Sequence, residues 1–349
     1  MPPLRRCRVL VSHLAAATAP EPEPAASAEP APPSAIAIID LSAEDGDAAI
    51  AARLSEAFER TGFAVVVGAP PPTVAAGAAL EAAAREFFAQ PEEEKFRVHV
   101  DEQHMEAPDG YPGYLEPGHS SVANLLGDFS RPPDAVELLT YKDLHYYEDE
   151  EQFADMLRTD MSPAKPPEFA PAVGEIGGYP SAAFREAALA HFWAVHALWQ
   201  RLCALSALAL EVPAGFFDEF FGPQMGTSLQ IRNYPRPEGG AELERGQMGF
   251  GAHNDSGFLT VVHTQTPGLQ VDPSGTGEWV DIPVVEGGYA VNVGRLLGRW
   301  TNDRWLSSIH RVVPPSLSPD EPTKVRDSRH HPVTLSSSCS LEAFQSADL

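Results

Sequence analysis

The feature that most restricts this chain is a His-x-Asp pair, His253 and Asp255, followed much later by a second histidine, His310. Three short strand-like runs, rich in β-branched and aromatic residues, separate the pair from that histidine. Side chains of an extended segment alternate with a period of two, so the imidazole and the carboxylate are expected on one side. One metal ion can then contact both, and an antiparallel barrel of the intervening strands can return His310 to complete its ligands.

Two histidines and one carboxylate on one face of a metal leave the opposite positions open. That arrangement suits a non-haem Fe(II) centre, which has to bind a substrate and dioxygen. A His-x-Asp pair alone is weak support, because the chain has 12 histidines and 49 acidic residues. A pair on a surface turn is the alternative.

The segments around the pair carry a more specific signal. RNYPRP, with Tyr234, is followed in one order by GAHNDSGFLTVV, GLQV, EWVDIP, VNVG, RWTND and IHRVVPP. This series resembles the isopenicillin N synthase-like family of 2-oxoglutarate/Fe(II)-dependent dioxygenases. The resemblance is specific over residues 229–315 and recognisable from about residue 36.

The resemblance implies an α+β, mainly β fold, with a double-stranded β-helix (jelly-roll) core flanked by helices. Residues 36–180 are then the N-terminal α/β region, and residues 181–349 are a helix plus the core. The clearest expected helix covers 181–210, where apolar residues recur every three or four positions, and Pro213 is expected to end it. His191 and His196 lie five positions apart on this helix and are predicted to be packing or surface residues, not metal ligands.

The resemblance also implies the site. His253, Asp255 and His310 would hold Fe(II), and 2-oxoglutarate would chelate the metal and be contacted by Tyr234. Its far carboxylate requires an arginine and a hydroxyl group, which Arg326 and Ser328 would supply as the one Arg-x-Ser motif after His310. The implied activity is dioxygen-dependent hydroxylation or desaturation of a small organic metabolite.

The C-terminal end departs from the family pattern, so the chain is expected to be truncated or diverged after about residue 316. No Ile-Pro-Phe-Phe run follows Ser328. Arg326 and Ser328 are therefore either the cosubstrate anchor or ordinary loop residues, and a lost strand would leave an unpaired sheet edge.

Arg295 also stands where relatives usually have aspartate, which predicts a local change in hydrogen bonding while Asn292 and Gly294 keep the turn. Two alternatives follow, a catalytically impaired member acting as a binding protein and an iron oxidase that does not use 2-oxoglutarate.

The composition indicates which partners and which cellular compartment to expect. The net charge of −25 argues against a nucleic-acid partner, and the absence of a run of eighteen apolar residues argues against a membrane span. The partner expected is a small-molecule substrate, with the oligomeric state open. An odd, scattered set of cysteines predicts a reducing compartment and no zinc site: Cys7, Cys203 and Cys339.

Two segments allow more than one interpretation. Residues 1–35 carry three arginines and a Pro/Ala/Glu tract, which predicts a disordered or targeting segment. The protein is accordingly expected to be cytoplasmic, or organellar if that segment is a transit peptide. Tyr111 and Tyr114 either touch the substrate at the mouth of the site or pack against the barrel rim.

Overall fold

The computed structural model covers most of the chain between Ile36 and Ser340. It describes residues 36–99, 113–119, 121–125, 128–142, 179–213, 215–217, 226–235, 244, 246–264, 266–313 and 333–340. The predictions for residues 1–35, Tyr111, Arg326 and Ser328 lie outside the described residues.

The N-terminal region alternates strands and helices as the sequence predicts. Its elements are β1 (Ala37–Asp40), α2 (Asp47–Arg60), β2 (Phe63–Val67), α3 (Pro71–Phe88), α4 (Glu92–Lys95) and the short 3₁₀ helix η1 (Phe96–Val98). β1 and β2 pair in parallel, which requires the crossover that α2 provides. α3 begins at a proline, whose fixed φ and missing N–H suit the first turn, and it ends at Phe88, shortly before Pro91.

The long central helix, α8 (Ala182–Ala209), matches its prediction closely. It begins at Ser181, whose side-chain oxygen accepts a hydrogen bond from the Phe184 amide at 3.1 Å. It ends earlier than Pro213 requires, because Glu211 already has a left-handed backbone with φ 55°. His191 is buried in this helix, as expected of a packing residue.

The strands form two sheets. The larger has the order β1-β2-β10-β7-β12-β5-β4-β3, and its further members are β3 (Gly113–Leu115), β4 (Glu137–Lys142), β5 (Gly226–Asn233), β7 (Leu259–Thr264), β10 (Tyr289–Val293) and β12 (Val333–Ser340). The smaller has the order β6-β11-β8-β9, from β6 (Phe250–His253), β8 (Leu269–Asp272), β9 (Val280–Asp281) and β11 (Ile309–Val312). Two short helices complete the described elements, α6 (Val122–Leu125) and α9 (Arg295–Trp300). Between Asp255 and His310 there are thus four strands, β7 to β10, so the prediction of three was wrong.

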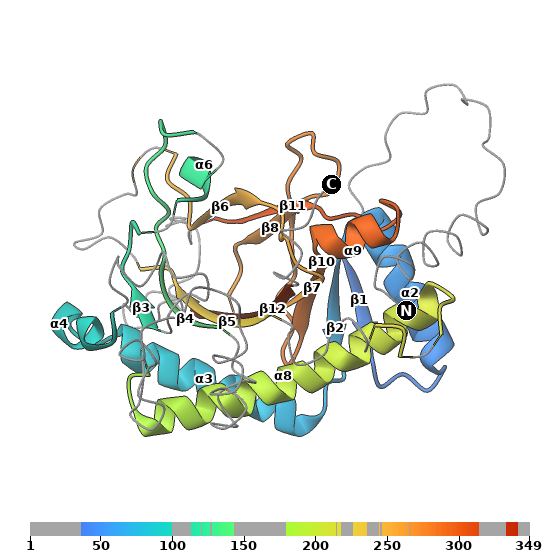
Figure 1. Ribbon diagram of the computed structural model, residues 1–349, viewed down its shortest axis with the longest axis horizontal. Coiled ribbons are helices and arrows are strands. Elements are labelled where there is room, and N and C mark those ends of the chain that lie inside the picture. The colour runs from blue at the N-terminus through green and yellow to red at the C-terminus, as the bar shows by residue number, and fades with distance from the viewer. Residues whose placement is uncertain are drawn as a thin grey trace, which may run out of the picture.

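The sheets and helices are layered. Figure 1 shows α8 and α3 running beneath the larger sheet, with the smaller sheet on its other side. Leu229 and Ile231 of β5 belong to the core cluster beneath this sheet, together with Phe192 of α8. A separate apolar cluster includes Val262 of β7 and Val271 of β8, and so joins the two sheets. The site described below lies on the smaller sheet.

A C-terminal strand occupies the centre of the larger sheet. β12 pairs antiparallel with β5 from Val333↔Asn233 to Ser340↔Gly226 and with β7 from Thr334↔Thr264 to Ser338↔Thr260. The unpaired edge expected from a lost strand is therefore absent between β5 and β7. Truncation or divergence of the C-terminal end remains a prediction.

Within the described part of the chain, no helix combines the length and the apolar composition needed to span a bilayer.

Candidate metal centre

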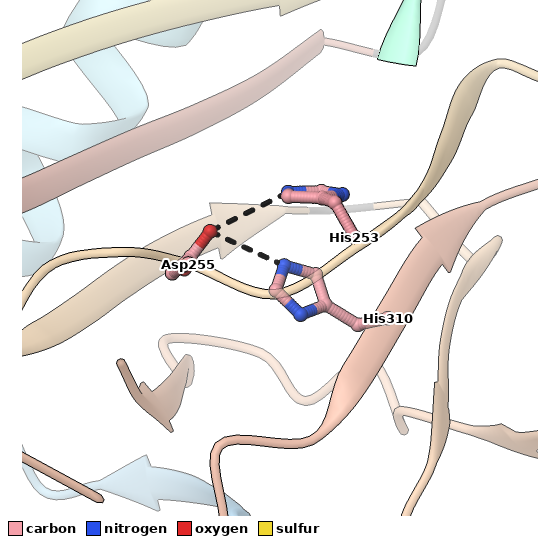
Figure 2. A group of neighbouring side chains, drawn as sticks. All are labelled: His253, Asp255 and His310. Carbon is pink, nitrogen blue, oxygen red and sulfur yellow. Dashed lines mark ion pairs between the residues drawn. The ribbon is translucent and has the colours of Figure 1, made fainter. Parts of the chain in front are cut away.

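Three elements bring His253, Asp255 and His310 together. His253 is the last residue of β6, Asp255 lies in the loop that follows, and His310 lies on β11. β6 and β11 pair antiparallel with His310 opposite His253, so the sheet register itself juxtaposes the imidazoles. Figure 2 shows the three side chains pointing toward one another. The strand expected to carry both His253 and Asp255 ends at His253, but the loop still turns the carboxylate toward both rings.

The three candidate ligand atoms lie at the corners of a small triangle. Asp255 Oδ1 lies 3.4 Å from His253 Nε2 and 3.5 Å from His310 Nε2, and one ligand atom from each residue lies within 4.8 Å of the others. The other ring nitrogens face backbone carbonyls, since Nδ1 of His253 is 2.9 Å from the Gly251 oxygen and Nδ1 of His310 is 3.2 Å from that of Ser308. A carbonyl can only accept, so each Nδ1 donates, and the Nε2 atoms are the ring nitrogens that can serve as metal ligands.

The second oxygen of Asp255 is held by its neighbours. Oδ2 accepts hydrogen bonds from Thr260 Oγ1 at 2.5 Å and from Asn292 Nδ2 at 2.8 Å. Burial raises the pKa of this carboxyl, but His310 and His253 outweigh burial and hold its pKa well below the usual range. The side chain is therefore an oriented carboxylate with Oδ1 directed at the two histidines.

The contacts of Thr260 and Asn292 with Asp255 are not among the predictions from the sequence. Both lie on strands of the larger sheet and are buried, beside neighbours that face the helices. A buried polar residue within an apolar strand was the available signal, because it needs a partner. The sequence predicts only that Asn292 helps to keep a turn, and the structure adds its hydrogen bond to Asp255.

The loop containing Asp255 is also fixed through its backbone. The Arg295 amide donates to the Asp255 carbonyl at 2.7 Å, and Asn254 Nδ2 donates to the Ser307 carbonyl at 2.5 Å. The Arg295 bond uses only main-chain atoms, so it does not depend on the residue type at this position. These bonds connect the loop after His253 to the first residue of α9 and to the segment that follows this helix.

Tyr234 and Tyr114 are the other predicted residues that the structure describes, and both are buried. Tyr234 follows β5, is 3% exposed, and its hydroxyl group has no hydrogen-bond partner among the described residues. Burial raises its pKa to about 12, against an opposing effect of Arg232. Tyr114 is buried and donates to Glu137 Oε2 at 2.6 Å, which agrees with the packing interpretation.

Comparisons with known proteins agree with this geometry. Residues 226–321 match the 2OG-Fe(II) oxygenase superfamily, and residues 36–165 match the family described as non-haem dioxygenase in morphine synthesis N-terminal. A "2-oxoglutarate-Fe(II) type oxidoreductase hxnY" of Emericella nidulans is 38% identical over 132 residues, 37% of this chain and 37% of that protein. "Clavatol oxidase claD" of Penicillium crustosum is 40% identical over 114 residues, 31% of this chain and 33% of that protein. The alignments thus span about a third of the length of these relatives.

Among solved structures, the dioxygenase for auxin oxidation of rice superimposes with a TM-score of 0.56 at 23% identity, covering 87% of this chain and 82% of that one. This likeness shows a shared fold. The two family matches and the His-Asp-His group place this chain in a class of proteins rather than in a single activity. The chain belongs to the 2OG-Fe(II) oxygenase superfamily, whose members use Fe(II), 2-oxoglutarate and dioxygen, and this confirms the resemblance seen in its sequence.

Proposed function

We propose that the protein is a non-haem Fe(II)- and 2-oxoglutarate-dependent oxygenase that hydroxylates or desaturates a small organic metabolite. His253, Asp255 and His310 hold the iron, and the two sheets are the halves of a double-stranded β-helix. The names of the relatives, an oxidoreductase and a clavatol oxidase, support oxidation of a small molecule as the reaction class.

One observation carries the proposal: three atoms that can bind a metal converge, one from each of His253, Asp255 and His310. Oδ1 of Asp255 and Nε2 of both histidines face one another, while Oδ2 and both Nδ1 atoms are engaged elsewhere. The separations of 3.4 and 3.5 Å exceed those of charge-assisted hydrogen bonds. A first-row metal with bonds of about 2.1 Å fits such spacings.

The residues of this chain then have separate tasks. When bound, Fe(II) with 2-oxoglutarate and dioxygen supplies the oxidising chemistry, and the protein supplies geometry and access. Asp255 and the two histidines would hold the metal, and its remaining positions would be available for cosubstrate and dioxygen. Thr260 and Asn292 keep Asp255 in its ligating orientation, a role that outer contacts commonly have at metal sites.

The test is an anaerobic titration with Fe(II) and then with 2-oxoglutarate, followed by the visible metal-to-ligand charge-transfer band of the chelate. We expect the band with the wild type. Asp255→Asn removes the negative charge with little change of shape, so Fe(II) affinity should fall by more than the roughly 10- to 100-fold typical of a lost outer contact. Asp303→Asn is the control, because Asp303 is exposed and its carboxylate pairs with Arg299, away from the metal centre. Equal iron affinity in wild type and Asp255→Asn would refute the assignment.

One observation favours an alternative. The sequence of β12 is VTLSSSCS and contains no arginine, although this strand lies beside β5 and β7 at the centre of the larger sheet. An iron oxidase that does not use 2-oxoglutarate, or an impaired binding protein, needs no arginine there. Iron binding without a charge-transfer band would favour these alternatives over the oxygenase.

A further inference from the structure

One of the two candidate ligand histidines lies on an edge strand. In the smaller sheet β11 lies between β6 and β8, so His310 has a strand on either side, whereas among the described strands β6 pairs only with β11. The His253 side chain is also the more exposed, at 19% against 9% for His310. An edge strand has backbone groups without ladder partners, so its position depends on what covers that edge.

This edge strand is irregular next to the ligand. The pairs His310↔His253 and Val312↔Phe250 are two residues apart on β11 but three apart on β6. β6 therefore holds one extra residue, a β-bulge, between Phe250 and His253. Bulges interrupt the ladder and re-aim the side chains beside them. The direction of the His253 side chain thus depends on how this bulge is held.

Asp134 holds the bulge from outside the sheet. Its side chain is buried, and it accepts hydrogen bonds from the amide of Gly251, inside the bulge, and from the amide of Val122, the first residue of α6, at 3.0 Å. α6 packs against β6 (Figure 1). A Cβ on Gly251 would lie only 2.8 Å from Val122 Cβ, so the strand and the helix are in close contact here. One carboxylate therefore ties the bulge to a separate element.

The residues on either side of Asp134 follow the same edge of the sheet. The Ala135 amide donates to the Met248 carbonyl at 2.7 Å, and Gln247 Nε2 donates to the Pro133 carbonyl at 3.0 Å. This loop thus lies along the segment that leads into β6. These bonds fix the backbone on both sides of Asp134, so its carboxylate is presented to the bulge.

Gly251 connects this carboxylate to the candidate ligand. Its N–H group donates to Asp134, and its carbonyl oxygen accepts from Nδ1 of His253 at 2.9 Å, which leaves Nε2 of that ring facing Asp255. Burial raises the pKa of the Asp134 carboxyl, and both amides and the charge of His253 oppose the rise. The carboxylate therefore acts on His253 through the backbone of the bulge and through its charge.

We propose that Asp134 is a positioning residue of the metal centre, which holds the bulge of β6 so that His253 directs its Nε2 atom at the metal position. The inference rests on the proposed function, because it takes His253 as an Fe(II) ligand. Asp134 lies in the loop between α6 and β4, so the N-terminal region has a part in building the site. Loss of Asp134 should disturb His253 and spare His310, which strands hold on both sides.

The experiment compares Fe(II) binding with stability in wild type, Asp134→Asn, Asp134→Ala and two controls. Asp134→Asn keeps the shape but turns an NH₂ group toward one of the two amides, and Asp134→Ala removes both acceptor oxygens. Asp128→Asn is the matched control, because Asp128 lies in the same loop, is exposed and bonds Ser130. Ser181→Ala removes the hydrogen bond that begins α8 and controls for a loss of stability alone.

Three measurements separate positioning from stability. Anaerobic Fe(II) titration against a competing chelator gives the affinity, and urea unfolding of the metal-free protein gives the stability. Paramagnetic proton NMR of the Fe(II) protein resolves the Nδ1–H signals of the two coordinating histidines, one for each ring.

We expect Asp134→Asn to bind Fe(II) roughly 10-fold more weakly than wild type, as is typical of a lost outer contact, and Asp134→Ala to lose at least as much. One of the two Nδ1–H signals should shift or broaden while the other stays, because only His253 depends on the bulge. Asp128→Asn and Ser181→Ala should keep the wild-type affinity and both signals.

The opposite results have distinct meanings. Wild-type affinity and unchanged signals in both Asp134 variants would overturn the role of Asp134 while leaving the oxygenase intact. A loss of affinity that Ser181→Ala reproduces at equal stability, or an equal change in both histidine signals, would do the same. A wild type that does not bind Fe(II) would overturn the proposed function, and this inference with it.

Discussion

Asp255 divides its two oxygens between different tasks. Oδ2 accepts from Thr260 and Asn292, whereas Oδ1 faces the histidines, so the orientation of the ligating atom is decided by two residues that do not contact the metal position. Such outer contacts reduce the rotameric freedom that a carboxylate would otherwise lose on binding an ion. Substitution of Thr260 or Asn292 should therefore change the Fe(II) affinity of the site, although neither residue is a candidate metal ligand.

We expect Thr260→Val to lower Fe(II) affinity by roughly 10-fold, because valine keeps the shape of threonine and removes the hydroxyl that bonds Oδ2. Thr260→Ser keeps the hydroxyl group and should retain most of the affinity. Anaerobic Fe(II) titration with a competing chelator measures both. Iron affinities of valine and serine variants that cannot be told apart would show that Oδ2 needs no partner here.

Gly294 illustrates a steric requirement next to the same carboxylate. A Cβ on Gly294 would lie 2.0 Å from the carbonyl oxygen of Gly257, although its φ of −86° is open to any residue. Gly294→Ala should therefore destabilise the fold by about 1–3 kcal/mol and weaken iron binding, since Arg295 next to it holds Asp255. Urea unfolding measures the first effect.

Gly298→Ala is the matched control for this prediction. It lies in α9, where the nearest atom to an added Cβ is the Trp305 oxygen at 3.3 Å, and alanine favours a helix. We expect a much smaller loss of stability than for Gly294→Ala, because a contact of 3.3 Å requires a shift of only a few tenths of an ångström. A Gly294→Ala protein as stable as Gly298→Ala would mean that the Gly257 loop yields easily.

At the scale of elements, the sequence predicts those helices and strands whose local residue pattern is enough to specify their secondary structure. α2 and α8 have apolar residues every three or four positions, and β2 is a run of β-branched residues, so local pattern and tertiary packing agree. β12 has no such pattern, because four of its eight residues are serine, and only its pairing with β5 and β7 identifies it as a strand.

The metal centre was predictable in part, because some of its residues lie in recognisable local patterns and others do not. His253, Asp255 and His310 occur within recognisable motifs, so their convergence could be inferred before the structure. Thr260 and Asn292 are single polar residues in strands, which sequence alone does not distinguish from solvated positions. Their hydrogen bonds to Asp255 Oδ2 reveal their inward direction.

α8 is the element on which both ends of the larger sheet rest, since it packs against α2 and α3 and contributes to two core clusters. Its first turn is capped by Ser181, so Ser181→Ala should lower the free energy of unfolding by about 0.5–2 kcal/mol. Ser181→Asp keeps an accepting oxygen at the helix N-terminus and should unfold like wild type. Chemical denaturation that finds the alanine and aspartate variants equally stable would contradict the cap.

For the molecule as a whole, stability should depend on pH through a histidine far from the metal centre. His191 is 1% exposed in α8, and burial, aided by the neighbouring His263, lowers its pKa to about 3 from 6.5. Below pH 6.5 the unfolded chain takes up a proton that the folded protein excludes, so stability is lost as the pH falls from about 6.5 toward about 3. The slope from one such group is at most about 1.4 kcal/mol per pH unit.

His191→Leu removes this titration and fills a similar volume with an apolar side chain. The Nδ1 atom of His191 has no hydrogen-bond partner among the described residues, so the substitution breaks no described hydrogen bond of that atom. Urea unfolding at several pH values between 7 and 4.5 should give a shallower loss of stability for the variant than for wild type. Parallel curves would mean that His191 is protonated without cost, and that the acid sensitivity of the fold arises from other groups such as His196, whose pKa burial also lowers.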